Sequence, residues 1–434
     1  MQRQIVLIFL ASLMISGCAE PPSLDYDILR ATDTENPRSH IDLLRQQGER
    51  IAGTDFISGN KVVLLRDGKQ AYPAMLAAIR SAKHRIDMES FTFDGKEGED
   101  FARALLKRHA AGAQVNLIYD AIGSSDMPSD LFDHMRAMGI HLLQYNPIDV
   151  PSVMDSSFNH RDHRKLLMID GKVAFTGGVN ISEVYRMKSR LKRFFDVRSQ
   201  DIDIEHMPWR DTQVRIEGPV VAEFEHLFMQ TWHDNGGDGI RSAPPTPTTP
   251  KGDLFVQAID GAPDRDRFTI YRSLLVSIAL AQKSIHLTAA YFVPTPDLVD
   301  ALENAAQRGV DVVLILPSRS DSDLALKAGH SFYEDLMESG VQIYERQDVV
   351  LHAKTAVIDS LWSTVGSSNL DWRSVLFNNE CNAVILGKNF GQRMEAMFRD
   401  DLAQSKRIDP GEWGERPLWE RLDEWKASLV EYFL

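Results

Sequence analysis

The 434-residue sequence has very little cysteine, only Cys18 and Cys381. Two cysteines cannot build the disulfide framework that stabilises a small secreted scaffold, so we expect no such framework. The sequence also lacks an HExxH motif and clusters of cysteine and histidine. Since those are the usual signatures of a protein-bound zinc, we expect a protein without a metal or other cofactor.

An excess of positive charge is missing as well, because 62 acidic residues outnumber 48 basic ones and give a formal net charge of -14. Nucleic-acid binding draws much of its affinity from Lys and Arg side chains that neutralise phosphates. We therefore expect no nucleic-acid partner, although a local basic patch would be compatible with this charge. The hydrophobic content of 43% is ordinary for a globular protein, and the length allows two domains or one large duplicated domain.

The sequence has no hydrophobic run long enough to span a bilayer comfortably. The apolar run from Ile5 to Ile15 follows Arg3 and predicts a signal sequence over residues 1–17. The run ends in Ile-Ser-Gly-Cys18, which resembles a bacterial lipobox and implies cleavage before Cys18 and lipid attachment to it. Such a protein would be lipid-anchored in the bacterial cell envelope. In a Gram-negative organism, Ala19 rather than Asp after the cysteine resembles the sorting pattern of outer-membrane lipoproteins. The alternative is an uncleaved anchor with an incidental cysteine.

Two stretches repeat one pattern without a gap, since each of its five matched residues returns 189 positions later. The matched residues are His163, Lys165, Asp170, Gly177 and Asn180 in the first copy, and His352, Lys354, Asp359, Gly366 and Asn369 in the second. Residues two apart in a strand point to one face, so each copy offers an imidazole beside a cation. We interpret the aspartates as turn residues, because they have the opposite parity and precede Gly171 and Ser360. Gly-x-x-Asn would bring backbone and amide donors near an anion, and two such strands meeting at one pocket would make a phosphate site.

The pattern HxKxxxxD followed by GxxN, present twice, resembles that of the phospholipase D superfamily over roughly residues 60–430. Within it, the segments MPWRDTQVRIEGPVV, AAYFVPT, HAKTAVID and GSSNLDWRS are most similar to bacterial cardiolipin synthases, as is the downstream NNE. The resemblance implies that the histidine, lysine and aspartate of both motifs are the catalytic residues and that no metal is needed. Two departures bear on acceptor or acyl-chain preference. Ala290 stands where cardiolipin synthases usually carry proline, and the segment SFTFDGKEG follows the family loosely.

Strands and helices alternate in both halves of the chain, which predicts an α/β fold. In the first half we predict strands at 85–93, 114–119 and 140–145 and helices at 71–82, 97–110 and 131–138. In the second half we predict strands at 284–292, 311–316 and 341–345 and helices at 270–280, 296–307 and 324–337. We expect two similar phospholipase D-like lobes, each a mixed sheet flanked by helices, with the active site at the lobe interface.

The predicted organisation has five parts. They are a signal peptide (1–17), a tether (18–60) that leads into a helix near 40–47, a first lobe (61–241), a Pro-rich linker (242–252) and a second lobe (253–434) with a C-terminal helix. Closely spaced prolines in SAPPTPTTPKG favour an extended linker.

A phosphodiester is hard to cleave because its oxygens repel nucleophiles and its alkoxide is a poor leaving group. Both motif lysines, with Asn180 and Asn369, would hold the phosphate oxygens. One histidine would attack phosphorus and the other would protonate the departing alcohol, giving a phosphohistidine that an alcohol or water resolves. The family's usual order makes His163 the nucleophile and His352 the acid, although the sequence alone leaves the two roles interchangeable.

A histidine that reacts through one nitrogen needs a carboxylate on the other to fix its tautomer. We assign Glu380, in NNE, to His352 and Asp211, in WRDTQVRIEGP, to His163. The alternative for each carboxylate is an ordinary surface acid. His160 is more typical of a pocket or surface residue than of a catalyst.

Two further segments bear on membrane contact. The segment YRMKSRLKRFFDVRSQ carries six basic residues between positions 186 and 198 beside Phe194 and Phe195. It suits either an anionic membrane surface or a solvated loop. The C-terminal segment places Leu418, Leu422, Trp425 and Leu429 at helical spacing. Its net charge is acidic, which disfavours adhesion to anionic lipid, so we predict a helix that packs on the body.

The leading function is a phosphatidyltransferase that makes cardiolipin from phosphatidylglycerol. A phospholipase D that mainly hydrolyses, releasing phosphatidic acid, would differ only in whether water wins the second step. A phosphodiesterase or nuclease of the same superfamily is the third alternative, and a non-enzymatic envelope scaffold is the fourth. The oligomeric state is not indicated by the sequence.

Overall fold

The computed structural model describes residues 39–147, 159–182, 207–240, 249–262 and 267–430. The signal sequence, Cys18, the basic loop at 186–198 and most of the Pro-rich linker lie outside these ranges. Within them, no helix combines the length and the apolar character needed to cross a bilayer.

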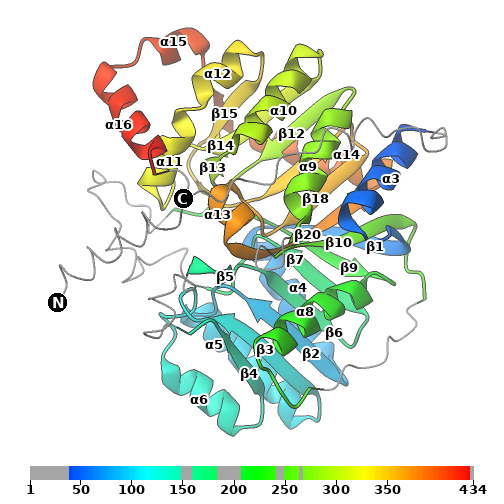
Figure 1. The fold of residues 1–434 in the computed structure, drawn as a ribbon. Coiled ribbons are helices and arrows are strands. Elements are labelled where there is room, and N and C mark those ends of the chain that lie inside the picture. The colour runs from blue at the N-terminus through cyan, green and yellow to red at the C-terminus, as the bar shows by residue number, and fades with distance from the viewer. Residues whose placement is uncertain (1–38, 148–158, 183–206, 241–248, 263–266, 431–434) are drawn as a thin grey trace.

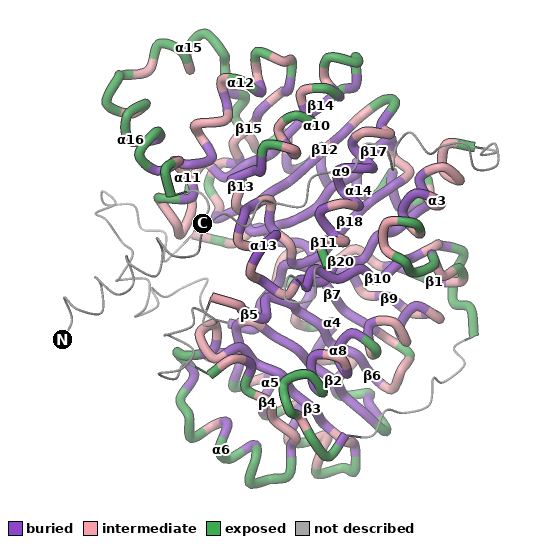
Figure 2. The backbone as a smooth tube through the Cα atoms, viewed as in Figure 1, coloured by how far each residue is buried: buried purple, intermediate pink, exposed green. Residues whose placement is uncertain are grey.

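The first lobe is a mixed sheet covered by helices (Figure 1). Its strands lie in the order β1 (Ile57–Arg66), β9 (Thr212–Glu217), β7 (Val173–Gly177), β6 (Lys165–Ile169), β2 (Arg85–Ser90), β3 (Gln114–Asp120) and β4 (His141–Tyr145). The flanking helices are α4 (Asp67–Ser81), α5 (Gly95–Ala110), α6 (Ser129–Ala137) and α8 (Val221–Asp234). Every residue of β2 and β6 is buried, because helices cover both faces of the sheet centre (Figure 2).

The second lobe repeats this arrangement. Its strands lie in the order β10 (Leu254–Ala262), β20 (Asn378–Leu386), β18 (Trp362–Gly366), β17 (Thr355–Ile358), β12 (Ser284–Thr288), β14 (Asp311–Pro317), β15 (Gln342–Arg346) and β21 (Ser405–Arg407). The principal helices are α9 (Thr269–Leu280), α10 (Pro296–Gln307), α11 (Asp323–His330), α12 (Tyr333–Glu338) and α14 (Lys388–Leu402). The order β18-β17-β12-β14-β15 matches β7-β6-β2-β3-β4 of the first lobe. The predicted fold class, two similar α/β lobes, is confirmed.

Strand β1 joins the two sheets. Its first residues pair with β10, where Asn60 is opposite Leu254, and the rest pair with β9 from Lys61 to Arg66. Helix α3 (His40–Ala52) precedes β1 and packs against α9, with Leu44 buried in the second-lobe core. Residues 39–60 therefore belong to the folded body, and the tether assigned to 18–60 extends too far. The helix is mostly polar, so its sequence gave little sign of the buried face.

Two other predictions differ in detail from the structure. The predicted helix 324–337 is divided into α11 and α12, and the predicted strand 284–292 ends at Thr288, before the short β13 (Phe292–Val293). Near its end, α11 approaches β13 closely at Gly329, where a Cβ would stand 2.5 Å from the Phe292 carbonyl oxygen. A residue with a side chain would force the two elements apart.

Asp170 and Asp359 close the hairpins that follow the HxK strands. Both have left-handed backbone, with φ of 52° and 53°. The Asp170 carboxylate accepts hydrogen bonds from the backbone N–H groups of Lys83, His84 and Arg85, each at 2.8 Å. Asp359 accepts three in the same way from Gln282 to Ser284, at 2.7 to 3.0 Å. Each aspartate thus fastens its hairpin to the start of the neighbouring strand, which supports a structural interpretation.

We predict that Asp170→Asn lowers the free energy of unfolding by about 2–3 kcal/mol, since an amide cannot accept three N–H groups as a carboxylate does. Burial opposes ionisation of Asp170, but the three backbone N–H groups outweigh it and lower its pKa. The stabilisation is therefore complete above the ordinary aspartate pKa and is lost as the pH falls through the lowered value. Urea unfolding at pH 7 and at pH 3 measures both effects.

The exposed Asp130→Asn serves as the control for that measurement. A loss at pH 7 that is no greater than the control's would contradict the structural role of Asp170.

Candidate active site

Each HxK histidine is placed by a short strand pair that crosses between the lobes. β5 (Arg161–Asp162) runs parallel to the start of β20, and β16 (Val350–Leu351) runs parallel to β8 (Trp209–Arg210). The backbone N–H of His163 donates to the Asn379 carbonyl at 2.9 Å, and that of His352 donates to the Arg210 carbonyl at 2.8 Å. Each histidine therefore lies beside the residue that precedes a carboxylate of the other lobe.

Each carboxylate consequently contacts the histidine of the other lobe. His163 Nδ1 lies 2.9 Å from Glu380 Oε1, and His352 Nδ1 lies 2.7 Å from Asp211 Oδ2. The assignment of each carboxylate to the histidine of its own lobe is wrong. It assumed that a motif is completed by its own half of the chain, whereas the short strand pairs exchange these segments between halves.

Both carboxylates are buried and held by further donors. Glu380 is fully buried and accepts from the hydroxyls of Ser374, at 2.9 Å, and Ser367, at 2.5 Å. Asp211 accepts from the backbone N–H of Thr212 at 2.7 Å. Gly178 leaves the room for it, since a Cβ there would stand 2.2 Å from Asp211 Oδ1. These contacts fix the orientation of each carboxylate and, through it, of each imidazole.

With Nδ1 facing a carboxylate, each imidazole keeps Nε2 for chemistry. Burial lowers the pKa of His163 to about 4, helped by the charges of Lys165 and Lys354, while Glu380 opposes the shift. Burial also lowers the pKa of His352, and the charges of Lys354 and Lys165 act in the same direction. The positive charges of the lysines from both lobes thus act on the pKa of each histidine. At neutral pH both rings are neutral in the free protein, which leaves an Nε2 lone pair able to attack.

The two lysines are buried cations. Lys165 Nζ donates to the His163 carbonyl at 2.7 Å, and Lys354 Nζ donates to the His352 carbonyl at 2.6 Å. Burial lowers the pKa of Lys165 to about 7 and that of Lys354 to about 8, although Glu380 and Asp211 oppose both shifts. Because charged lysines are costly in this position, an anion that enters between them would be bound strongly.

The asparagines and several aromatic rings complete the site. Asn180 and Asn369 are each 8% exposed, and Asn369 Oδ1 has no hydrogen-bond partner among the described residues. Phe91 packs edge-on against His163 at 4.9 Å between ring centroids. Trp209 and Tyr291 lie 5.1 and 6.3 Å from the ring of His352. The sequence analysis did not identify these rings as part of the site, since nothing local distinguishes them from core aromatics.

Two arginines beside the motifs were also missed. Arg164, between the first histidine and lysine, is 1% exposed and donates to the carbonyl of Glu380 and to Thr231. Arg210 forms a bidentate contact with Asp401 of α14. A buried arginine directly next to a proposed catalytic residue fixes the backbone on which that residue stands. In the sequence, the available signal of this role was the position of each arginine directly next to a proposed site residue.

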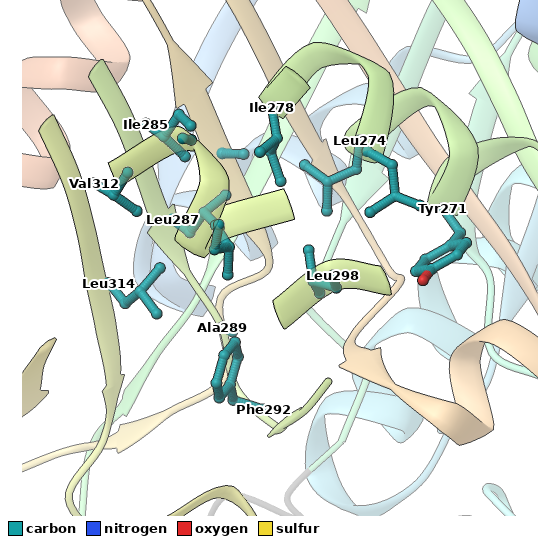
Figure 3. Packing of buried hydrophobic residues seen from close by; sticks show 14 of the residues in the cluster. Tyr271, Leu274, Ile278, Ile285, Leu287, Ala289, Phe292, Leu298, Val312 and Leu314 are labelled. Atoms are coloured by element: carbon teal, nitrogen blue, oxygen red, sulfur yellow. The ribbon is translucent and has the colours of Figure 1, made fainter. Parts of the chain in front are cut away.

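A hollow that is partly open to solvent lies beside the site in the second lobe. Lys354 and Asn369 belong to its lining, as do Tyr271, Leu274 and Leu298, which Figure 3 shows within the second-lobe core. The repeat explains why there is space. Counterparts 189 positions apart are Leu167 and Ala356, Phe175 and Thr364, and Val179 and Ser368. The larger member of each pair is buried in the first-lobe core, and the smaller one lines the hollow.

Among the described residues, no group of three or more His, Cys, Asp or Glu side chains is arranged to hold a metal ion.

The family description "Cardiolipin synthase, PLD-like domain" matches residues 75–185 and 274–402. The chain is 30% identical over 399 residues to cardiolipin synthase 2 of Bacillus cereus, covering 91% of this chain and 75% of that protein. It is 29% identical over 383 residues to the major cardiolipin synthase of Bacillus subtilis, covering 87% and 76% of the two chains. Among solved structures, phosphatidylserine synthase of Haemophilus influenzae superposes with a TM-score of 0.61 at 14% identity, over 90% of this chain and 99% of that one.

We predict that Lys165→Met stabilises the protein while impairing the site. Below pH 7 the native state carries the full cost of the buried charge. As the pH rises from about 7 to 10.5, the folded lysine loses its proton before the unfolded one does, and the cost disappears. The gain in melting temperature should thus be largest below pH 7 and vanish near pH 10.5.

Thermal unfolding across this pH range measures the effect, with Lys172→Met as an exposed control. A variant that is less stable than the wild type at pH 6 would show that Lys165 is a net stabilising contact.

Proposed function

We propose that this chain, which belongs to the cardiolipin synthase family with phospholipase D-like domains, makes cardiolipin from two molecules of phosphatidylglycerol. Its reaction type is that of a phosphatidyltransferase of the phospholipase D type. The observation that carries the proposal is the pair of imidazoles, each fixed by a carboxylate of the other lobe and each experiencing both buried lysines. Such a site suits one phosphodiester bound between the lobes.

In the first step, His163 Nε2 attacks phosphorus and the bond from phosphorus to the glycerol oxygen breaks. His352, protonated once the anionic phosphate has raised its pKa, gives its proton to the departing glycerol. Lys165, Lys354, Asn180 and Asn369 hold the phosphate oxygens as negative charge builds up on them. Glu380 stabilises the positive charge on His163 in the intermediate, and its buried position supports this role.

In the second step, a hydroxyl of another phosphatidylglycerol attacks the phosphohistidine, and neutral His352 accepts the hydroxyl proton. The P–N bond breaks, His163 is regenerated and cardiolipin leaves. Water in place of the hydroxyl would give phosphatidic acid. The hollow beside Lys354 supports a substrate with a large apolar part next to its phosphate.

For the location, we propose that Cys18 carries a lipid that holds the protein at a membrane of the bacterial envelope. Each buried methylene contributes about 0.8 kcal/mol, so acyl chains on one residue anchor the protein firmly. Labelled palmitate fed to cells should enter the wild type and not Cys18→Ser, and equal labelling of both would refute the assignment. The basic loop at 186–198 remains a second candidate contact.

We predict that His163→Ala and His352→Ala each lower cardiolipin formation by at least about 10³-fold, because each removes a group that bonds with or protonates the reacting atoms. Purified protein is incubated with labelled phosphatidylglycerol, with and without added alcohols, and separately with single-stranded DNA. Cardiolipin as the main product distinguishes transfer from hydrolysis, and DNA cleavage would favour the nuclease alternative.

The roles of the two histidines are separated with a p-nitrophenyl phosphodiester, whose leaving group needs no acid. His352→Ala should still release a burst of nitrophenolate, whereas His163→Ala should not. His160→Ala is the control, and a reversed pattern would exchange the two roles.

We predict that Thr364→Phe, which copies Phe175 of the first lobe, fills the hollow. It should lower kcat/KM for diacyl phosphatidylglycerol about tenfold more than for the same phosphodiester without acyl chains, while the melting temperature is kept or raised because a cavity is filled. Thr364→Ser, which leaves the hollow open, is the matched control. An equal effect on both substrates would show that the hollow does not bind the acyl chains of the substrate.

A further inference from the structure

Helix α16 (Leu418–Ser428) turns its apolar side away from the body. Five large apolar side chains on or directly after the helix are more than half exposed: Leu418 (76%), Trp419 (64%), Leu422 (54%), Trp425 (57%) and Leu429 (63%). Four of them recur at helical spacing and form one stripe. The predicted helix does pack on the body, through its contact with α11, but the stripe is not on the packed side.

The side that does face the body is small and polar. Glu424 and Ala427 are the buried residues of α16, and the helix packs against α11. The amphipathic order of a surface helix is thus inverted. Contiguous exposed apolar surface of this kind marks an interaction site.

A buried ion pair holds the helix in this orientation. Glu424 accepts from both terminal nitrogens of Arg416, and the Arg416 guanidinium lies 3.3 Å from the ring centroid of Trp413. Trp413 in turn stacks on Tyr333 at 4.8 Å between centroids. Rotating the stripe inward would turn Glu424 away from Arg416 and leave that partly buried guanidinium without its carboxylate partner, which is costly.

The stripe lies at the same end of the second lobe as the candidate active site. α16 packs on α11, and α11 packs on β13. Tyr291, directly before β13, lies 6.3 Å from the ring of His352. Figure 1 shows α16, α11, β13, α13 (Trp372–Leu376) and β5 toward the left of the molecule. A surface that meets the stripe would therefore also lie near the site.

We propose that α16 is a membrane-docking helix that inserts its apolar stripe into the lipid surface and so presents the active site to phospholipid in the bilayer. Tryptophan and leucine are the side chains that favour the boundary between headgroups and acyl chains. The choice of a bilayer rather than another protein rests on the proposed function, since the substrate itself is a component of that surface.

The two basic residues of α16 are paired with acidic side chains, so the contact depends on apolar insertion. Arg421 lies 3.0 Å from Glu334, and Lys426 lies 2.9 Å from Asp423. Docking through α16 therefore persists at high salt and on zwitterionic vesicles. A contact made by a basic loop would weaken under both conditions.

The test uses a local probe, because a lipid anchor elsewhere in the chain would also bring the protein to vesicles. In full-length Cys18→Ser protein, an environment-sensitive fluorophore is attached at Leu422→Cys. The matched control carries it at Met138→Cys, an apolar residue of the first lobe that is 52% exposed. Phosphatidylglycerol and phosphatidylcholine vesicles with nitroxide-labelled acyl chains should quench the probe at position 422 at least threefold more than the probe at 138, in 50 mM and in 500 mM salt.

A second measurement links docking to turnover. The double variant Leu422→Ser/Trp425→Ser should lower the ratio of activity on vesicles to activity on monomeric short-chain phosphatidylglycerol about tenfold, and Glu420→Gln/Lys426→Gln should leave that ratio as in the wild type. Probe quenching does not depend on turnover, so a protein that docks without acting on phosphatidylglycerol refutes the proposed function and leaves the docking surface intact.

Two results would overturn the proposal. One is an unquenched probe at position 422 with full vesicle activity. The other is a concentration-dependent dimer, seen by sedimentation velocity without lipid, that the double serine variant abolishes, because it would show that a second copy of the chain covers the stripe.

Discussion

The exchange of histidines and carboxylates between the lobes is the constraint on which the rest of the structure depends. His163 is oriented by Glu380 and His352 by Asp211, so neither lobe contains a complete catalytic unit. The exchange is enforced by backbone pairing, since β5 and β16 each form a ladder with a strand from the other half. The two lobes therefore have to be in register before either imidazole has its tautomer fixed. Strand β1, which pairs with both sheets, contributes to that register.

The arrangement brings two lysines and two histidines together in one buried site. Burial disfavours the charged forms, which lowers the pKa of Lys165 to about 7 and that of His163 to about 4. In the proposed function, the same destabilisation would become binding energy once a phosphate enters, because the anion would supply the compensating charge. A site of this kind has its cations in place before the substrate arrives, so little reorganisation is needed as charge develops.

Duplication supplied two similar lobes, and small differences between them gave each a different task. The larger residue at each of three paired positions fills the first-lobe core, while Thr364 and its neighbours leave a hollow beside Lys354. The second lobe also carries α16, whose leucines and tryptophans are exposed. In this arrangement the first lobe supplies the proposed nucleophile, and the second adds the surfaces that suit a lipid substrate.

The sequence by itself determined the fold class, the duplication and most of the secondary structure. The hydrophobic periodicity predicts helices and strands because it depends only on which residues within one element are buried. The duplication is visible because HxKxxxxD and GxxN recur at a constant spacing. It also identified Asp170 and Asp359 as turn residues, because parity along a strand is a local property. The predicted element boundaries mostly agree within a few residues for the same reason.

Only the tertiary structure decided which groups meet. The partner of each histidine depends on pairing between segments about 140 or more positions apart, as for His352 and Asp211, and no local pattern encodes it. The outward orientation of α16 likewise follows from the ion pair of Glu424 with Arg416 and not from the helix's own amphipathicity. The hollow beside Lys354 required the packing of the second lobe, since residues far apart along that half of the chain line it together. Contacts between distant residues are fixed by the whole fold, whereas a sequence pattern reports only on neighbours along the chain.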